Sequence, residues 1–134
     1  MITPKNYFEE KEKKVINKDL FYVEAENIIK EIAEDEKPSM TSTQIRKFYD
    51  EILRRKMIIE LRDNKEIEFK RQLPYIRMIV TKAKYGFSRK PKTVNKKFVD
   101  FLEKNIIPIK DYETFKVFCD LFEAVVAYSK KHLS

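Results

Sequence analysis

The strongest restriction on the fold of this chain is its single glycine, Gly86, among 134 residues. Tight β-hairpins, phosphate-binding loops and dinucleotide-binding folds all need glycines at backbone angles that other residues avoid. A chain with one glycine therefore favours helices joined by short loops. Its length fits one domain, and 43% hydrophobic residues with 13% aromatics suffice for a packed core. We expect an all-α fold, a single compact bundle of about five helices.

Apolar residues recur at helical spacing in five segments, and four of these segments carry a side chain near the start that can cap a helix. The third segment instead contains Pro74, which either kinks a longer helix or marks where the helix proper begins. Residues 1–18 are charged, and we expect a loosely ordered N-terminal segment there, ahead of a helical-bundle domain over 19–134. The expected helices are 19–35, 41–62, 66–87, 93–105 and 111–130, with caps at Asp19, Thr41 (in a capping box with Gln44), Thr93 and Asp111.

The charge of the chain is positive and unevenly distributed. The formal net charge is +7, yet residues 1–40 hold 7 basic and 10 acidic residues. Residues 70–97 contain ten Lys or Arg and no Asp or Glu. Scattered lysines would only keep a helical surface soluble, whereas a window of this kind favours a polyanionic partner.

The basic residues of the third helix flank its core face on both sides. At 100° per residue, Lys70, Arg77 and Lys84 form one stripe, and Lys82 and Arg89 lie on the other side. Lys and Arg bind phosphates through charge, which is independent of base sequence and sensitive to salt. A helix-turn-helix DNA reader would want a short turn, often with glycine, and residues that read base edges. The loops of this chain lack that pattern, so a nonspecific RNA or single-strand contact fits better.

Two residues at the end of this helix leave alternatives open. Tyr85 either stacks on a base or packs with its hydroxyl at the rim, and we favour packing. Gly86 either lets a phosphate backbone approach closely or is an ordinary residue at a helix end.

Catalytic and metal-binding residues are scarce. The only histidine, His132, is the third residue from the C-terminal end of the sequence and cannot complete a triad or a metal site. Cys119 lies among phenylalanines, as a small core residue would. We therefore expect no enzyme activity and no cofactor or metal. No run of 18 apolar residues and no signal peptide are present, which predicts a cytoplasmic protein without membrane contact.

Three stretches resemble the small subunit of type III-A CRISPR–Cas effector complexes, the Csm small subunit. They are "TSTQIRKFYDEI" (41–52), "YIRMIVTKAKYGFSR" (75–89) and "FEAVVAYSKKH" (122–132), and they occur in the order of the family. The resemblance implies a noncatalytic helical protein of antiviral defence. Several copies of such a protein line a ribonucleoprotein filament beside the crRNA–target RNA duplex, and neighbouring subunits cleave nucleic acid.

The expected partners are crRNA–target RNA, other subunits of the effector complex, and copies of the chain itself, stacked in the complex or dimeric in isolation. The alternative is a protein-binding scaffold or inhibitor whose basic face meets an acidic protein without RNA. The resemblance indicates RNA-binding roles for Arg46, Lys47, Lys82, Tyr85, Arg89 and Lys130, and the charge geometry adds Arg54, Arg77, Lys84 and Lys90.

Overall fold

The structure, a computed structural model, describes residues 1–10, 14–35 and 38–133. These residues form five α-helices, preceded by a 3-10 turn, a small antiparallel sheet and a π-helical turn. The predicted all-α fold of about five helices is therefore confirmed. In chain order the elements are η1 (Pro4–Asn6), β1 (Phe8–Glu10), β2 (Val15–Ile16), η2 (Leu20–Glu24), α1 (Ala25–Glu34), α2 (Ser42–Glu60), α3 (Lys65–Ser88), α4 (Lys96–Ile106) and α5 (Tyr112–His132).

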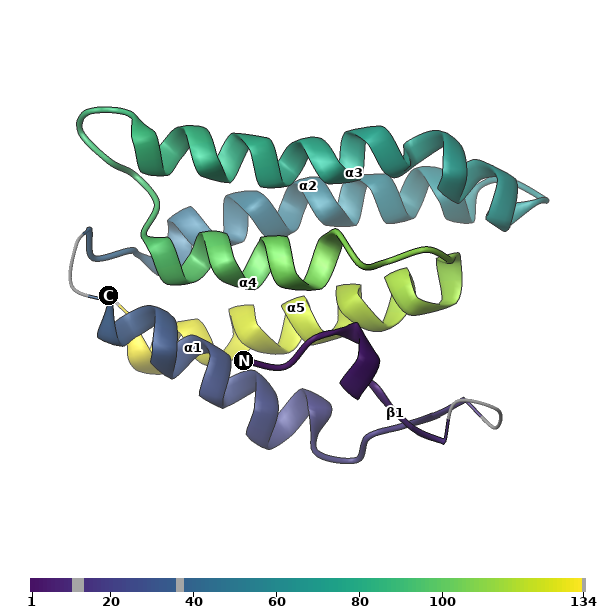
Figure 1. Cartoon of the computed structure of the whole chain (residues 1–134), viewed down its shortest axis with the longest axis horizontal. Helices are drawn as coiled ribbons and strands as arrows, with labels where there is room; N and C mark the ends of the chain where they lie inside the picture. The colour runs from purple at the N-terminus through teal and green to yellow at the C-terminus, as the bar shows by residue number, and fades with distance from the viewer. Residues whose placement is uncertain (11–13, 36–37, 134) are drawn as a thin grey trace.

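The helices pack as a chain of neighbours. α1 lies against α5, α5 against α2, α2 against α3, and α3 against α4. Figure 1 shows α2 and α3 as a hairpin along one edge of the bundle, with α1 at the opposite edge. The start of α2 and the ends of α3 and α5 lie on the same side of the molecule, the left of Figure 1.

Four phenylalanines fix α4 against α5. Phe98 and Phe101 of α4 and Phe118 and Phe122 of α5 are completely buried. Their ring centroids lie 5.4 to 6.3 Å apart, in tilted or edge-to-face pairs. Such pairs stabilise a core beyond the area that they bury. The apolar spacing of the two segments predicts this seam correctly.

Two of the predicted caps are confirmed. Thr41 Oγ1 accepts from the Gln44 amide at 3.2 Å, and Gln44 Oε1 accepts from the Thr41 amide at 2.8 Å. Asp111 Oδ1 accepts from the Thr114 amide at 2.7 Å. The Asp19 side chain makes no capping bond and pairs with Lys18 instead.

The predicted cap at Thr93 is wrong, because α4 begins later. The Thr93 amide donates to the Gly86 carbonyl at 3.0 Å, which folds the turn back onto the end of α3. Asn95 is the cap: its Oδ1 accepts from the Phe98 amide at 3.0 Å, and its Nδ2 donates to the Ile32 carbonyl at 3.0 Å. Asn95 thus serves the helix and a contact with α1 at once.

Pro74 lies inside α3 and does not begin it. The helix starts nine residues earlier at Lys65, where Asn64 Oδ1 accepts from the Ile67 amide at 3.1 Å. The cations of the charge pattern on both sides of Pro74, from Lys70 to Lys84, therefore lie on one continuous helix. Among the described helices, none combines the length and the apolar character that crossing a membrane requires.

Residues 1–10 contact the bundle through Tyr7, a contact that the charge of the segment does not indicate. Tyr7 is completely buried, and its hydroxyl donates to Asn105 Oδ1 at 2.7 Å. Asn105 Nδ2 in turn donates to the Ile2 carbonyl at 3.1 Å. The antiparallel pairing of β1 with β2 follows directly, with Phe8 opposite Ile16. Local charge does not reveal a buried partner that lies about 100 residues away in the sequence.

Candidate nucleic-acid interface

All ten residues predicted to bind RNA are exposed. All but one of them come from the α2–α3 hairpin and the turn that follows it, so the structure brings them onto two adjacent helices. The exception is Lys130, in the last turn of α5. The residues are Arg46, Lys47 and Arg54 on α2, Arg77, Lys82, Lys84 and Tyr85 on α3, Arg89 and Lys90 after α3, and Lys130 on α5.

Carboxylates from neighbouring helices pair with lysines of the basic window, residues 70–97. Lys82 Nζ lies 2.9 Å from Glu51 Oε1 of α2, and Lys84 Nζ lies 2.5 Å from Glu103 Oε2 of α4. About half of each lysine side chain stays exposed, at 50% and 53%. Exposed pairs of this kind contribute little to stability, roughly 0–1 kcal/mol, so a phosphate can compete for either lysine.

The other candidates are less constrained. Arg77 Nη2 donates to the Ile107 carbonyl at 3.3 Å, which ties it to the end of α4. Among the described residues, Arg77, Arg89 and five further cationic candidates have no carboxylate as an ion-pair partner. The five are Arg46, Lys47, Arg54, Lys90 and Lys130.

Tyr85 does not pack in the way that we favoured from the sequence. Its side chain is 66% exposed, and the Arg89 guanidinium carbon lies 5.9 Å from its ring centroid. The position is exposed because it falls on the outward side of α3, opposite the buried residues Ile76 and Ala83. The stacking alternative is therefore the one that the geometry allows.

Gly86 serves the protein's own packing. It is buried, and a Cβ at this position would lie 2.7 Å from Val94 Cγ2 and 3.0 Å from Thr93 Oγ1. The missing side chain thus lets the turn before α4 close onto α3. A phosphate backbone has no access to Gly86, so that alternative is wrong.

The comparison with known protein families assigns the chain. The model of the Csm2 Type III-A family matches residues 16–134. The chain belongs to the Csm2 family. That family is the small subunit of the type III-A CRISPR–Csm complex, so the resemblance seen in the three sequence stretches is confirmed and the chain is a structural subunit of that effector. Searches of curated proteins and of solved structures gave no match.

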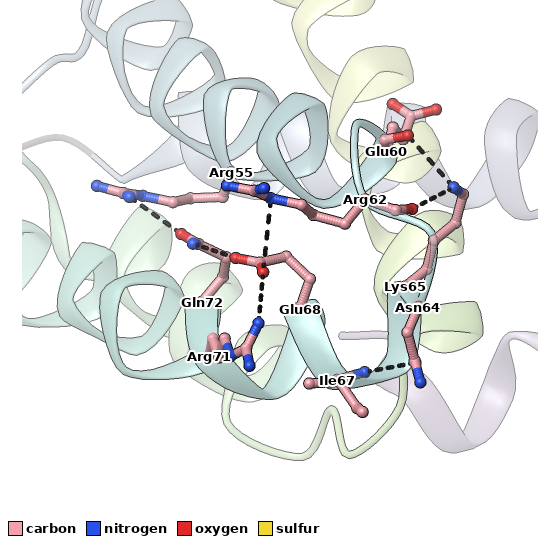
Figure 2. Close-up of polar contacts among 9 residues, drawn as sticks. All are labelled: Arg55, Glu60, Arg62, Asn64, Lys65, Ile67, Glu68, Arg71 and Gln72. Atoms are coloured by element: carbon pink, nitrogen blue, oxygen red, sulfur yellow. Dashed lines mark hydrogen bonds and ion pairs between the residues drawn. The ribbon is translucent and has the colours of Figure 1, made fainter.

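The sequence reasoning missed a polar network that joins α2 to α3 in this Csm2-family subunit (Figure 2). Buried Glu68 accepts from Gln72 Nε2 at 2.9 Å and from Arg71 Nη1 at 3.4 Å, and Gln72 Oε1 accepts from Arg55 Nη1 at 3.1 Å. The hydrogen bonds from Gln72 and then from Arg71, together with the nearby positive charge of Arg62, lower the pKa of Glu68. The spacing of Glu68 to Arg71 and Gln72, three and four residues, was the available signal.

The two candidate nucleophilic or ligating residues lie apart. Cys119 is buried as predicted, and burial raises the pKa of its thiol well above the ordinary value. His132 Nε2 lies 2.8 Å from Glu26 Oε2, so it fastens the end of α5 to α1. Within the described part of the chain, no three His, Cys, Asp or Glu side chains gather where they could hold a metal ion.

Proposed function

We propose that this subunit is a noncatalytic RNA-binding protein that lines the crRNA–target RNA of a type III-A effector with the exposed face of its α2–α3 hairpin. The observation that carries the proposal is the gathering of nine exposed candidate residues on two adjacent helices and the turn after them. Membership of the Csm2 family supports it. The subunit would act in the cytoplasm in antiviral defence, with copies stacked head to tail along the RNA.

Binding would rest on phosphates. Each Lys or Arg that neutralises a phosphate releases counterions, so affinity falls with salt and ignores base sequence. Arg46, Lys47 and Lys90 would contribute most directly, because no described carboxylate pairs with them. One copy offers few such contacts, so we expect weak binding by the isolated chain and tight incorporation with partner subunits.

The test is a titration of labelled single-stranded RNA, and of double-stranded DNA of equal length, with the purified protein at low and physiological salt. We expect RNA binding that weakens steeply with salt and is indifferent to sequence. The double variant Lys82→Glu/Arg89→Glu should bind more weakly and remain folded.

The matched control is Lys5→Glu/Lys30→Glu, which changes the net charge equally at exposed positions outside the hairpin. Equal affinity of the two double variants for RNA would refute the placement. If both double variants lost RNA binding, the loss would be explained by the change in net charge and not by the position of the residues.

A second candidate function is a protein scaffold or inhibitor that meets an acidic partner without RNA. The observation in its favour is a set of exposed apolar side chains at the α2–α3 turn: Met57, Leu61 and Ile67 are 58%, 84% and 47% exposed. This function predicts that the charge-reversal variants lose complex formation while the wild type has no measurable affinity for RNA.

A further inference from the structure

Two tyrosines on α3 present their rings to solvent. Tyr75 is 48% exposed and Tyr85 is 66% exposed. Tyrosine is intermediate among residue types in its tendency to be buried, and these two rings are far more exposed than the completely buried phenylalanines of α4 and α5. Two exposed rings on one helix that is also rich in cations therefore indicate a candidate ligand site.

Each ring is paired with an arginine. The Arg89 guanidinium carbon lies 5.9 Å from the Tyr85 ring centroid, and the Arg55 guanidinium carbon lies 4.8 Å from the Tyr75 ring centroid. Arginine over the face of an aromatic ring is an attractive cation–π contact. Since the guanidinium takes one face of the ring and the side chains are 48% and 66% exposed, a second planar group would stack on the opposite face.

Tyr75 is held by the network of Figure 2. Arg55 Nη1 donates to Gln72 Oε1 at 3.1 Å, and Gln72 Nε2 donates to buried Glu68 at 2.9 Å. Because Glu68 is fixed in the α2–α3 packing, Arg55 has a defined position beneath the Tyr75 ring. A preorganised ring loses less conformational freedom when a ligand binds.

Cations border the two rings. Lys82 lies seven residues after Tyr75 on the same side of α3, and Lys84 precedes Tyr85. The carboxylates that meet these lysines, Glu51 and Glu103, belong to exposed pairs. Aromatic faces beside a positively charged track are the combination that binds single-stranded nucleic acid, because bases stack while phosphates meet cations.

We propose that Tyr85 with Arg89, and Tyr75 with Arg55, are two stacking platforms for unpaired RNA bases. This inference rests on the proposed function and adds that the two rings meet RNA bases that are not paired in the crRNA–target duplex. The rings are ten residues apart, or about 15 Å along the helix at about 1.5 Å per residue. Since stacked nucleotides in one strand are about 3.4 Å apart, the platforms would hold bases separated by several nucleotides.

The experiment measures the affinity of the full chain for a labelled single-stranded RNA and for a duplex RNA of equal length. Tyr85→Leu removes the ring from an exposed site, so the variant should unfold at the wild-type temperature. We expect its affinity for single-stranded RNA to fall about tenfold, because the stacking of one base on the ring is lost. The duplex affinity and the dependence on salt should stay unchanged, because no phosphate contact is lost. Tyr85→Phe should bind as the wild type does.

Tyr22→Leu is the matched control. Tyr22 is also 66% exposed, but it lies in η2 beside Glu24, in the acidic part of the chain. Tyr22→Leu should leave RNA affinity unchanged. An RNA with abasic sites should bind wild type and Tyr85→Leu equally, because neither protein then has a base to stack.

The outcomes separate this inference from the proposed function. If Tyr85→Leu and Tyr75→Leu bind single-stranded RNA as tightly as Tyr22→Leu while Lys82→Glu/Arg89→Glu binds weakly, RNA binding stands and the stacking platforms do not. If the tyrosine variants keep their RNA affinity but fail to enter the effector complex, the rings belong to a protein contact and the inference is overturned. If the wild type binds no RNA even at low salt, both fail.

Discussion

Lys82 Nζ lies between the two carboxylate oxygens of Glu51, 2.9 Å from one and 3.0 Å from the other. The pair joins the middle of α2 to the last third of α3 at the surface that we propose for RNA. Glu51 therefore both holds Lys82 in place and competes with a phosphate for its charge. The balance of these two effects is measurable.

Glu51→Gln should raise the affinity for RNA. The substitution keeps the shape of the side chain but removes a negative charge, and it releases Lys82 from an exposed pair that contributes about 0.2–1 kcal/mol. We expect an affinity for single-stranded RNA about two- to fivefold higher at low salt, with the gain shrinking as salt screens the charges.

The control for this change is Glu34→Gln, which removes the same charge from an exposed residue of α1. Fluorescence anisotropy with one labelled RNA at several salt concentrations compares the two variants. An equal gain of RNA affinity in both variants would indicate a general effect of net charge. A loss of RNA affinity in Glu51→Gln would mean that Glu51 helps RNA binding by positioning Lys82 more than it hinders binding by competing with phosphate.

The same pair shows why the sequence predicts the helices better than the site. Apolar spacing and the caps at Thr41 and Asp111 are local, so the five helices can be read within a residue or a few at most ends. Glu51 is 31 residues from Lys82, and a window of sequence without carboxylates does not reveal one that arrives from the next helix. Exposure of the Lys and Arg candidates could be predicted, but their partners could not.

Tyr7→Phe should destabilise the protein. The substitution removes the hydroxyl that donates to Asn105 Oδ1 at 2.7 Å and leaves that buried acceptor without this donor. The expected loss is about 1–3 kcal/mol in the free energy of unfolding, seen as a lower midpoint in urea.

Tyr22→Phe is the control for Tyr7→Phe, because its hydroxyl is on an exposed side chain. It should change the free energy of unfolding by less than about 0.5 kcal/mol. Equal stability of Tyr7→Phe and wild type would show that the N-terminal residues do not stabilise the bundle.

The N-terminal segment and Gly86 illustrate a second limit of the sequence. Charge density over 1–18 describes solvation, but the burial of Tyr7 depends on a partner in α4 that only the fold brings near. Likewise, a glycine near a helix end has several uses, and the side chains of Thr93 and Val94 decide between them. In both cases the missing information is a contact, either between segments that are far apart in the sequence or across a turn.

Gly86→Ala should destabilise the protein, although alanine is the better helix former. Alanine gains up to about 1 kcal/mol over glycine within a helix. However, its Cβ would lie 2.7 Å from Val94 Cγ2, and buried valine has little freedom to move. Overpacking of this kind costs about 1–3 kcal/mol, so the net change should be a loss.

Thermal and urea unfolding of Gly86→Ala beside Ser88→Ala test this expectation. Ser88 is exposed in the same last turn of α3, so alanine there should be neutral or slightly stabilising. A Gly86→Ala variant more stable than the wild type would mean that the turn before α4 does not press on α3.

Glu26 should make stability depend on acidic pH. Its carboxylate lies 2.8 Å from His132 Nε2 and 2.9 Å from Lys131 Nζ, and these hydrogen bonds, with His132 first, lower its pKa from 4.5 to about 2. A carboxyl with a lowered pKa in the folded state stabilises the protein above its ordinary pKa, and this contribution is lost as pH falls. For Glu26 the loss should occur between about pH 4.5 and pH 2.

Glu26→Gln should therefore melt at a lower temperature than the wild type at pH 7, and the difference should vanish toward pH 2. Melting curves at four pH values measure this convergence, with Glu34→Gln as the control because no described residue forms an ion pair with Glu34. A difference that stays constant down to pH 2 would show that the charge of Glu26 does not fasten α5 to α1.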